Sequence, residues 1–160
     1  MPINEPVFLH HAWLMFVAVT VANAVILKFR SMAYIRQRPE LADGYRRLFW
    51  GILLLGNLPW LVMGFGLEVG GVPGMFSYIR PRDGNPFVLT FIASVGMLWI
   101  LGFYWIFARR GAEFLIDHPG LFRGNPQSPA MIRVFYCLAI AGGMIALIFM
   151  AAPDFVPMAR

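Results

Sequence analysis

The sequence has little charge and almost no cysteine, and both shortages restrict what the protein can be. Charged residues make up 13% of the 160 residues and hydrophobic residues 59%, whereas soluble domains are about a quarter charged and about half apolar. A soluble domain of this length could not bury so much apolar surface, so we expect lipid to cover part of it. The single cysteine, Cys137, excludes an internal disulfide and the paired-thiol chemistry of membrane disulfide oxidases.

Long uncharged runs are present instead. Four stretches contain no Asp, Glu, Lys or Arg: residues 7–27, 48–67, 87–108 and 134–152. Each is near the ~20 residues that a helix needs to cross the hydrocarbon core. The runs are continuously apolar rather than alternating, and they are about twice as long as a strand of a membrane barrel. We therefore predict an all-α polytopic membrane protein, in which residues 1–160 form one domain with a bundle of four transmembrane helices.

The basic residues indicate how the four helices are oriented. Of the 13 Lys and Arg residues, ten lie in the first and third connections between the runs. Because short cytoplasmic loops are enriched in Lys and Arg, we expect both termini on the non-cytoplasmic side, in a bacterial inner membrane. The basic loops would lie against anionic lipid headgroups. Basic charge confined to such loops does not indicate nucleic-acid binding.

The first run has one feature of a cleaved signal peptide. Ala22-Asn23-Ala24 fits the small-residue cleavage pattern, but the residues before the run include Glu5 and no positive charge. A signal peptide begins with basic residues, so we expect an uncleaved helix.

The second run contains the motif GNLPWLVMGFG, residues 56–66, which places an asparagine and a proline inside an apolar helix. Pro59 cannot donate to the carbonyl of Leu55, so we predict a kink between Leu55 and Asn57. In lipid the freed carbonyl needs another donor, and the Asn57 side chain could supply one or could instead reach a neighbouring helix.

Two interpretations of this kink stay open. The first is a packing contact in which Asn57 links helices. The second is a small binding site, because Asn57, Trp60 and Gly64 lie near one another at helical spacing. A glycine beside an indole would leave room for a flat ligand such as a quinone ring, a pigment or an acyl chain.

Two histidines are the other candidates for cofactor binding. His10 and His11 open the first helix beside Trp13, and a histidine in a span suggests haem or a metal. A bis-histidine haem needs two ligands at one depth on different helices, and His118 lies about a bilayer away. One chain therefore cannot supply the pair, although a dimer could, and interfacial anchoring is the alternative. The position resembles that in small haem-binding membrane proteins of the protoporphyrinogen-oxidase type, whose Trp-Phe-Ala-Gly run and later lysine have no match here.

The sequence has one cluster of acidic residues with a histidine, formed by Glu113, Asp117 and His118. No cysteine or second histidine completes a tetrahedral set, so we predict a solvated charged face and no metal site. No ionisable group lies deep in any span, which argues against an ion-coupled carrier.

The loops between the apolar runs and the small residues within the runs allow further structural predictions. We expect residues 30–47 to form a compact inner loop divided at Pro39, and residues 68–86, rich in Gly and Pro, to form consecutive turns. The third helix would extend to Asp117, and Pro129 would start the fourth. Small residues at helical spacing imply close helix contacts, within the bundle or between chains: Gly96, Gly102, Ala139, Gly142, Gly143 and Ala146.

Three runs, GNLPWLVMG, YIRPRDGNPF and GAEFLIDHPG, are similar to small uncharacterised four-span membrane proteins of bacterial genomes. The likeness covers most of the chain. It implies the same four-span architecture and no particular activity.

No nucleophile with a base, phosphate-binding loop or metal set appears in the sequence. We therefore expect a non-catalytic integral membrane protein, either an accessory or scaffolding subunit of a larger membrane complex or a homo-oligomer, whose partners are other membrane subunits or copies of itself. One alternative is a binder of haem b or a quinone, with the site formed by His10, His11, Asn57, Trp60 and Gly64. Another is a small transporter of lipids or apolar solutes.

Overall fold

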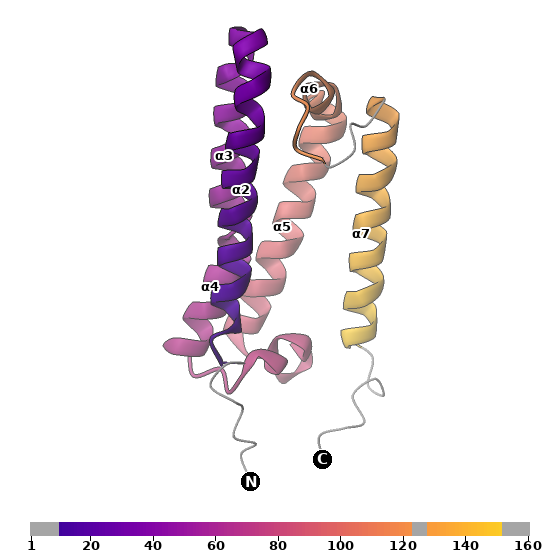
Figure 1. The fold of residues 1–160 in the computed structure, drawn as a ribbon. Helices are drawn as coiled ribbons and strands as arrows, with labels where there is room; N and C mark the ends of the chain where they lie inside the picture. Colours follow the sequence, from indigo (N-terminus) through magenta and orange to yellow (C-terminus); the bar gives the residue numbers. More distant parts are fainter. Residues whose placement is uncertain (1–9, 123–127, 152–160) are drawn as a thin grey trace.

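The computed structural model describes residues 10–122 and 128–151, and the regular structure within them is helical (Figure 1). The elements in chain order are α2 (Ala12–Gln37), the 3-10 helix η1 (Pro39–Leu41), α3 (Ala42–Leu55), α4 (Leu58–Glu68), the 3-10 helices η2 (Met75–Ile79) and η3 (Pro81–Asp83), α5 (Pro86–Ala108), α6 (Gly111–Asp117) and α7 (Pro129–Ala151). These described residues include no strand, which confirms the all-α prediction.

Four helical segments are long and apolar enough to cross a membrane: Ala12–Gln37, Pro39–Glu68, Pro86–Ala108 and Pro129–Met150. In the most apolar stretch of each segment, at most 22% of the residues are buried within the chain. Outward apolar side chains such as Phe29, Ile100 and Ile148 are 66–71% exposed, and lipid would cover them. Four such segments indicate a multi-pass membrane protein. Residues 7–9 and 152 of the predicted spans lie outside the described residues.

The first connection is much shorter than predicted. α2 continues to Gln37 and α3 begins at Ala42, so the expected inner loop over residues 30–47 is mostly helical. Arginine is a good helix former, and the charges at the membrane edge therefore do not end the helix. The break comes at Arg38, which is extended, with φ −138° and ψ 85°, because a residue before proline avoids the helical conformation.

The predicted helix from residue 87 to Asp117 is in fact two helices, α5 and α6. Arg110 between them has a positive φ of 57°, which interrupts the helix. The turn is tight because Gly111 packs on Trp105, where a Cβ atom would lie 2.6 Å from the indole ring. The predicted end at Asp117 and the predicted start of α7 at Pro129 are confirmed.

The loop between α4 and α5 forms consecutive turns, as its glycines and prolines predict. Tyr78 in η2 is 3% exposed, and its hydroxyl donates to the Met63 carbonyl of α4 at 3.0 Å. The ring joins a core with Met63, Leu67, Val72 and Val88. This loop is therefore a packed cap on α4 and α5.

Two glycines bring α5 and α7 together. Gly102 of α5 lies against Tyr136, whose hydroxyl donates to the Trp99 carbonyl at 2.8 Å. Gly143 of α7 lies against the Trp99 ring. These predicted small-residue contacts are thus within the bundle. By contrast, a Cβ atom added at Gly142 would have no atom of the described residues within 4 Å.

The helices form a bundle in which α2 packs on α3 and α4, α4 on α5, and α7 on α5 and α6. The start of α2 and the end of α7 lie at one end, here called the outer end in line with the predicted orientation (Figure 1). The two basic connections lie at the other, inner end. They touch each other there, since Arg38 Nη2 donates to the Asp117 carbonyl at 3.3 Å and the Tyr45 hydroxyl to the Pro119 carbonyl at 2.7 Å.

Candidate functional site

The second span is broken where the sequence predicts a kink. α3 ends at Leu55 and α4 begins at Leu58, and backbone hydrogen bonding resumes where the Leu61 N–H donates to the Asn57 carbonyl at 3.0 Å. The helix is thus interrupted at the predicted position, and Gly56 and Asn57 keep right-handed helical φ and ψ values. The Asn57 side chain supplies a substitute donor, but its Nδ2 donates to the Leu53 carbonyl at 2.7 Å rather than to Leu55.

Only one half of the Asn57 amide has a partner. The residue is 6% exposed, and its Oδ1 accepts no hydrogen bond from the described part of the chain. An unpaired buried acceptor costs about 1–3 kcal/mol. The interhelical hydrogen bond that one interpretation expects is therefore not formed within the described residues.

The three helix residues of the predicted ligand site make separate contacts. Trp60 stacks on Phe16 of α2, with the ring centroids 4.4 Å apart. Gly64 lies against Trp13 of α2, and a Cβ atom there would lie 2.5 Å from the indole ring. The room that we expected beside Gly64 is thus filled by Trp13, because a residue without a side chain lets α2 approach α4. Of the three residues, Trp60 alone lines the cavity described next.

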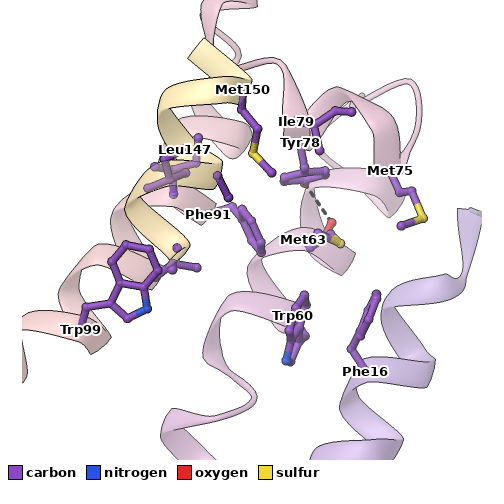
Figure 2. A pocket seen from close by; sticks show the side chains of 14 residues that line it. Phe16, Trp60, Met63, Met75, Tyr78, Ile79, Phe91, Trp99, Leu147 and Met150 are labelled. Carbon is purple, nitrogen blue, oxygen red and sulfur yellow. Dashed lines mark hydrogen bonds between the residues drawn. The ribbon is translucent and has the colours of Figure 1, made fainter. Parts of the chain in front are cut away.

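An apolar cavity of about 350 Å³ lies between α2, α4, η2, α5 and α7 near the outer end (Figure 2). Its largest side chains are the aromatic rings of Phe16, Trp60, Tyr78, Phe91 and Trp99. The methionines Met63, Met75 and Met150 and the α7 residues Ala146 and Leu147 also line it. Figure 2 shows the Tyr78 hydroxyl engaged by the Met63 carbonyl. The wall therefore presents apolar carbon and sulfur, with almost no free polar atom.

A polar cluster lies at the outer end, where the residues before α2 meet the end of α4. His11 Nδ1 is 3.0 Å from Glu68 Oε1, and His10 Nε2 is 3.9 Å from Glu68 Oε2. Trp13 Nε1 donates to Glu68 Oε1 at 3.3 Å. The sequence predicts no role for Glu68 beyond the end of a helix. The shared outer position of these helix ends was the one signal that could have indicated their contact.

Glu113, Asp117 and His118 do not converge on one point. Glu113 pairs with Arg133 of α7, and His118 Nδ1 lies 2.8 Å from the Phe114 carbonyl of its own helix. A hydrogen bond from its own backbone N–H, together with Arg133, holds the pKa of Glu113 below its usual value. The cluster attaches α6 to its neighbours and offers no joint set of metal ligands.

A second cavity, of about 430 Å³, lies at the inner end and is partly polar. Asn23 and Arg30 of α2 line it together with Ile52 and Phe122. The Arg30 guanidinium has no hydrogen-bond or ion-pair partner among the described residues. An anionic group could approach it from the membrane surface.

The apolar cavity was not predictable as a site, since its wall combines ordinary core residues from five elements. Trp60 was the one cavity residue that the sequence predicted for a ligand site, whereas Gly143 and Ala146 were predicted only as helix contacts. The two histidines were predicted without the carboxylate of Glu68. Comparison with protein-family models, with curated proteins and with solved structures finds no match to this chain.

Proposed function

We propose that this protein is a non-catalytic membrane protein that holds one apolar chain, of a lipid or of an isoprenoid quinone, in the cavity near the outer end. The cavity itself carries the proposal. Its volume of about 350 Å³ falls within the range of about 300–1,000 Å³ that is usual for small-molecule sites. Aromatic rings and methionines dominate its wall, and the flexible thioether side chains can adapt to an irregular apolar guest.

The chemistry of the wall narrows the class of ligand. No charged side chain and no histidine occurs among the described residues that line the cavity. A phosphate or an ammonium headgroup would therefore lose its hydration without gaining a partner, which is costly. Haem iron would find no imidazole there. An acyl or isoprenoid chain needs no polar partner and fits this lining best.

A variant of α7 tests the proposal. Ala146 lines the cavity, and Ala146→Phe should place a ring inside it, whereas Ala141→Phe alters the same helix at an exposed residue outside the lining. We expect wild type and Ala141→Phe, purified in mild detergent, to retain about one molecule of a defined lipid or quinone by mass spectrometry of the extract. Ala146→Phe should retain several-fold less.

Two results would contradict this proposal. One is equal retention by Ala146→Phe and wild type, and the other is a bound fraction with the composition of the bulk membrane lipid. A carrier for apolar solutes would use the same cavity, and transfer of the bound species between liposomes would distinguish a carrier from a static binder.

The exposed face of α7 favours a second candidate, an accessory subunit or a homo-oligomer. Ala139 and Gly142 are exposed, and nothing in the described residues occupies the space beside Gly142. Small residues allow close approach of another membrane helix. In a Cys137→Ser background, Gly142→Cys should form a disulfide dimer on oxidation if the partner is a second copy. A stoichiometric companion protein in a pull-down would instead indicate a subunit of a larger complex.

We also propose that the inner end faces the cytoplasm of a bacterial cell and contacts anionic lipid. The two basic connections lie at one end of the bundle and touch through Arg38 and Tyr45. Arg30 borders a cavity at the same end. Loops rich in Lys and Arg stay on the cytoplasmic side. A reporter enzyme fused after Arg160 that is active only outside the cytoplasm should be active, and an inactive, stably inserted fusion would contradict this orientation.

A further inference from the structure

We propose that His10, His11 and Glu68 form a binding site for a divalent transition-metal ion, best suited to Zn²⁺, at the outer end of the bundle. Two of them, His11 and Glu68, are 57 residues apart in the chain. Each histidine faces a different oxygen of one carboxylate, at 3.0 Å for His11 and 3.9 Å for His10. The site lies apart from the apolar cavity, and the proposal does not depend on what fills that cavity.

The ligand atoms are of the kinds that zinc prefers. Zinc binds imidazole nitrogen and carboxylate oxygen at about 2.0–2.2 Å, so two ligands of one tetrahedral ion lie about 3.3–3.6 Å apart. The ligand atoms of the three side chains all lie within 4.8 Å of one another. His11 and Glu68 have side chains that are 46% and 39% exposed, so rotation of these side chains can close the remaining distance. Three protein ligands leave the fourth position open to water.

The arrangement contains more than an ion pair requires. A pair between Glu68 and one histidine would be complete with His11, yet His10 lies by the second oxygen. Trp13 Nε1 also donates to the carboxylate at 3.3 Å, and its ring is fixed against Gly64. Hydrogen bonds of this kind orient the ligands of metal sites. The carboxylate is thus positioned by a group that need not itself bind the ion.

A bound ion would connect the start of α2 to the end of α4. Glu68 follows Trp60 by eight residues, which is about 12 Å along a helix, so the ion would join the same two helices about two turns away from the Phe16–Trp60 stack. Metal binding should therefore stabilise the contact between α2 and α4, and the thermal midpoint measures this without any activity assay.

Zinc titration of the full chain tests the inference. The protein is purified in detergent, and its affinity tag is removed because polyhistidine tags bind the same ions. Any bound metal is then removed with EDTA, which is itself removed by dialysis. We expect calorimetry to give one Zn²⁺ per chain and the thermal midpoint to rise by several degrees. His11→Asn and Glu68→Gln should each weaken binding at least tenfold and abolish the rise. Asp83→Asn, which removes an exposed carboxylate of the outer cap, is the matched control and should bind as wild type.

Circular dichroism without zinc shows whether each variant is folded, and His10→Asn provides a second variant if one of the others is not. No zinc binding by the wild type would overturn the proposal. So would zinc affinity that His11→Asn and Glu68→Gln leave unchanged. A loss of stability in these variants that is the same with and without zinc would show an ion pair only.

Discussion

Replacing Gly66 with alanine should destabilise the protein, although alanine is the better helix former. A Cβ atom at Gly66 would overlap the Tyr78 hydroxyl and lie 2.9 Å from Phe87 Cβ. The hydroxyl would have to move, which breaks its hydrogen bond to the Met63 carbonyl. Phe87 is less able to move, because its Cβ is fixed to the backbone of α5.

The magnitude follows from three terms. Loss of the Tyr78 hydrogen bond costs about 0.5–1.5 kcal/mol, and overpacking against Phe87 costs about 1–3 kcal/mol. Alanine in a helix interior gains about 0.5–1 kcal/mol over glycine. We therefore expect Gly66→Ala to lose about 0.5–4 kcal/mol. For a chain of this size, each kcal/mol lowers the midpoint by about 2–4 °C.

Gly51→Ala is the matched control for this substitution. Gly51 lies inside α3, and nothing stands within 4 Å of the position its Cβ would take. Alanine there should give the helix-propensity gain alone, about 0.5–1 kcal/mol of added stability. Thermal unfolding of both variants in detergent, followed by circular dichroism, should thus give shifts of opposite sign.

A double-mutant cycle isolates the hydroxyl. Tyr78→Phe alone should lose about 0.5–1.5 kcal/mol, at the lower end because the helical pattern of α4 gives the Met63 carbonyl a second donor. In Gly66→Ala/Tyr78→Phe the same hydrogen bond cannot be lost twice. The combined loss should therefore be smaller than the sum by about 0.5–1.5 kcal/mol. Strictly additive losses, or a Gly66→Ala variant as stable as Gly51→Ala, would refute the packing described for the cap.

Two further substitutions test single contacts. Asn57→Leu removes one hydrogen bond, worth about 0.6 kcal/mol in membrane proteins, but also an unpaired buried acceptor that costs about 1–3 kcal/mol. We expect unchanged or slightly higher stability in detergent, and a clear loss there would mean that Oδ1 has a partner in the isolated protein. The lowered pKa of Glu113 means that its contribution to stability is present above its ordinary value of 4.5 and is lost as the pH falls below it. Glu113→Gln should therefore reduce the loss of thermal stability in acid, while Asp43→Asn, which affects an exposed pair with Arg46, should leave it as in wild type.

The four spans were predictable because long uncharged runs have few alternatives to a membrane helix. The break before Pro59 was predictable for an equally local reason, since a missing N–H leaves a carbonyl without its donor. The inner ends of the helices were not predictable, because arginines at the membrane edge continue a helix as readily as they end it. Pro39 ended α2, whereas α5 ended just before Arg110, whose positive φ is rare for a residue other than glycine and was not predictable from its type.

The candidate sites likewise contain residues that the sequence predicts and residues that depend on how the helices pack. Histidine is rare enough to be noticed, so His10 and His11 were found, but the contact with Glu68 depends on how α2 packs on α4. Cavity residues such as Phe91 and Leu147 resemble any other apolar residue of a span. The empty volume between them depends on distances between helices, and a pattern within one helix does not report these distances.

The helix α4, which follows Gly56 and Asn57, links the two sites to each other. It brings Gly64 against Trp13 and Glu68 to His11. The same helix contributes Trp60 to the wall of the apolar cavity. Both the outer cluster and the cavity wall therefore depend on how α4 packs on α2 and α5.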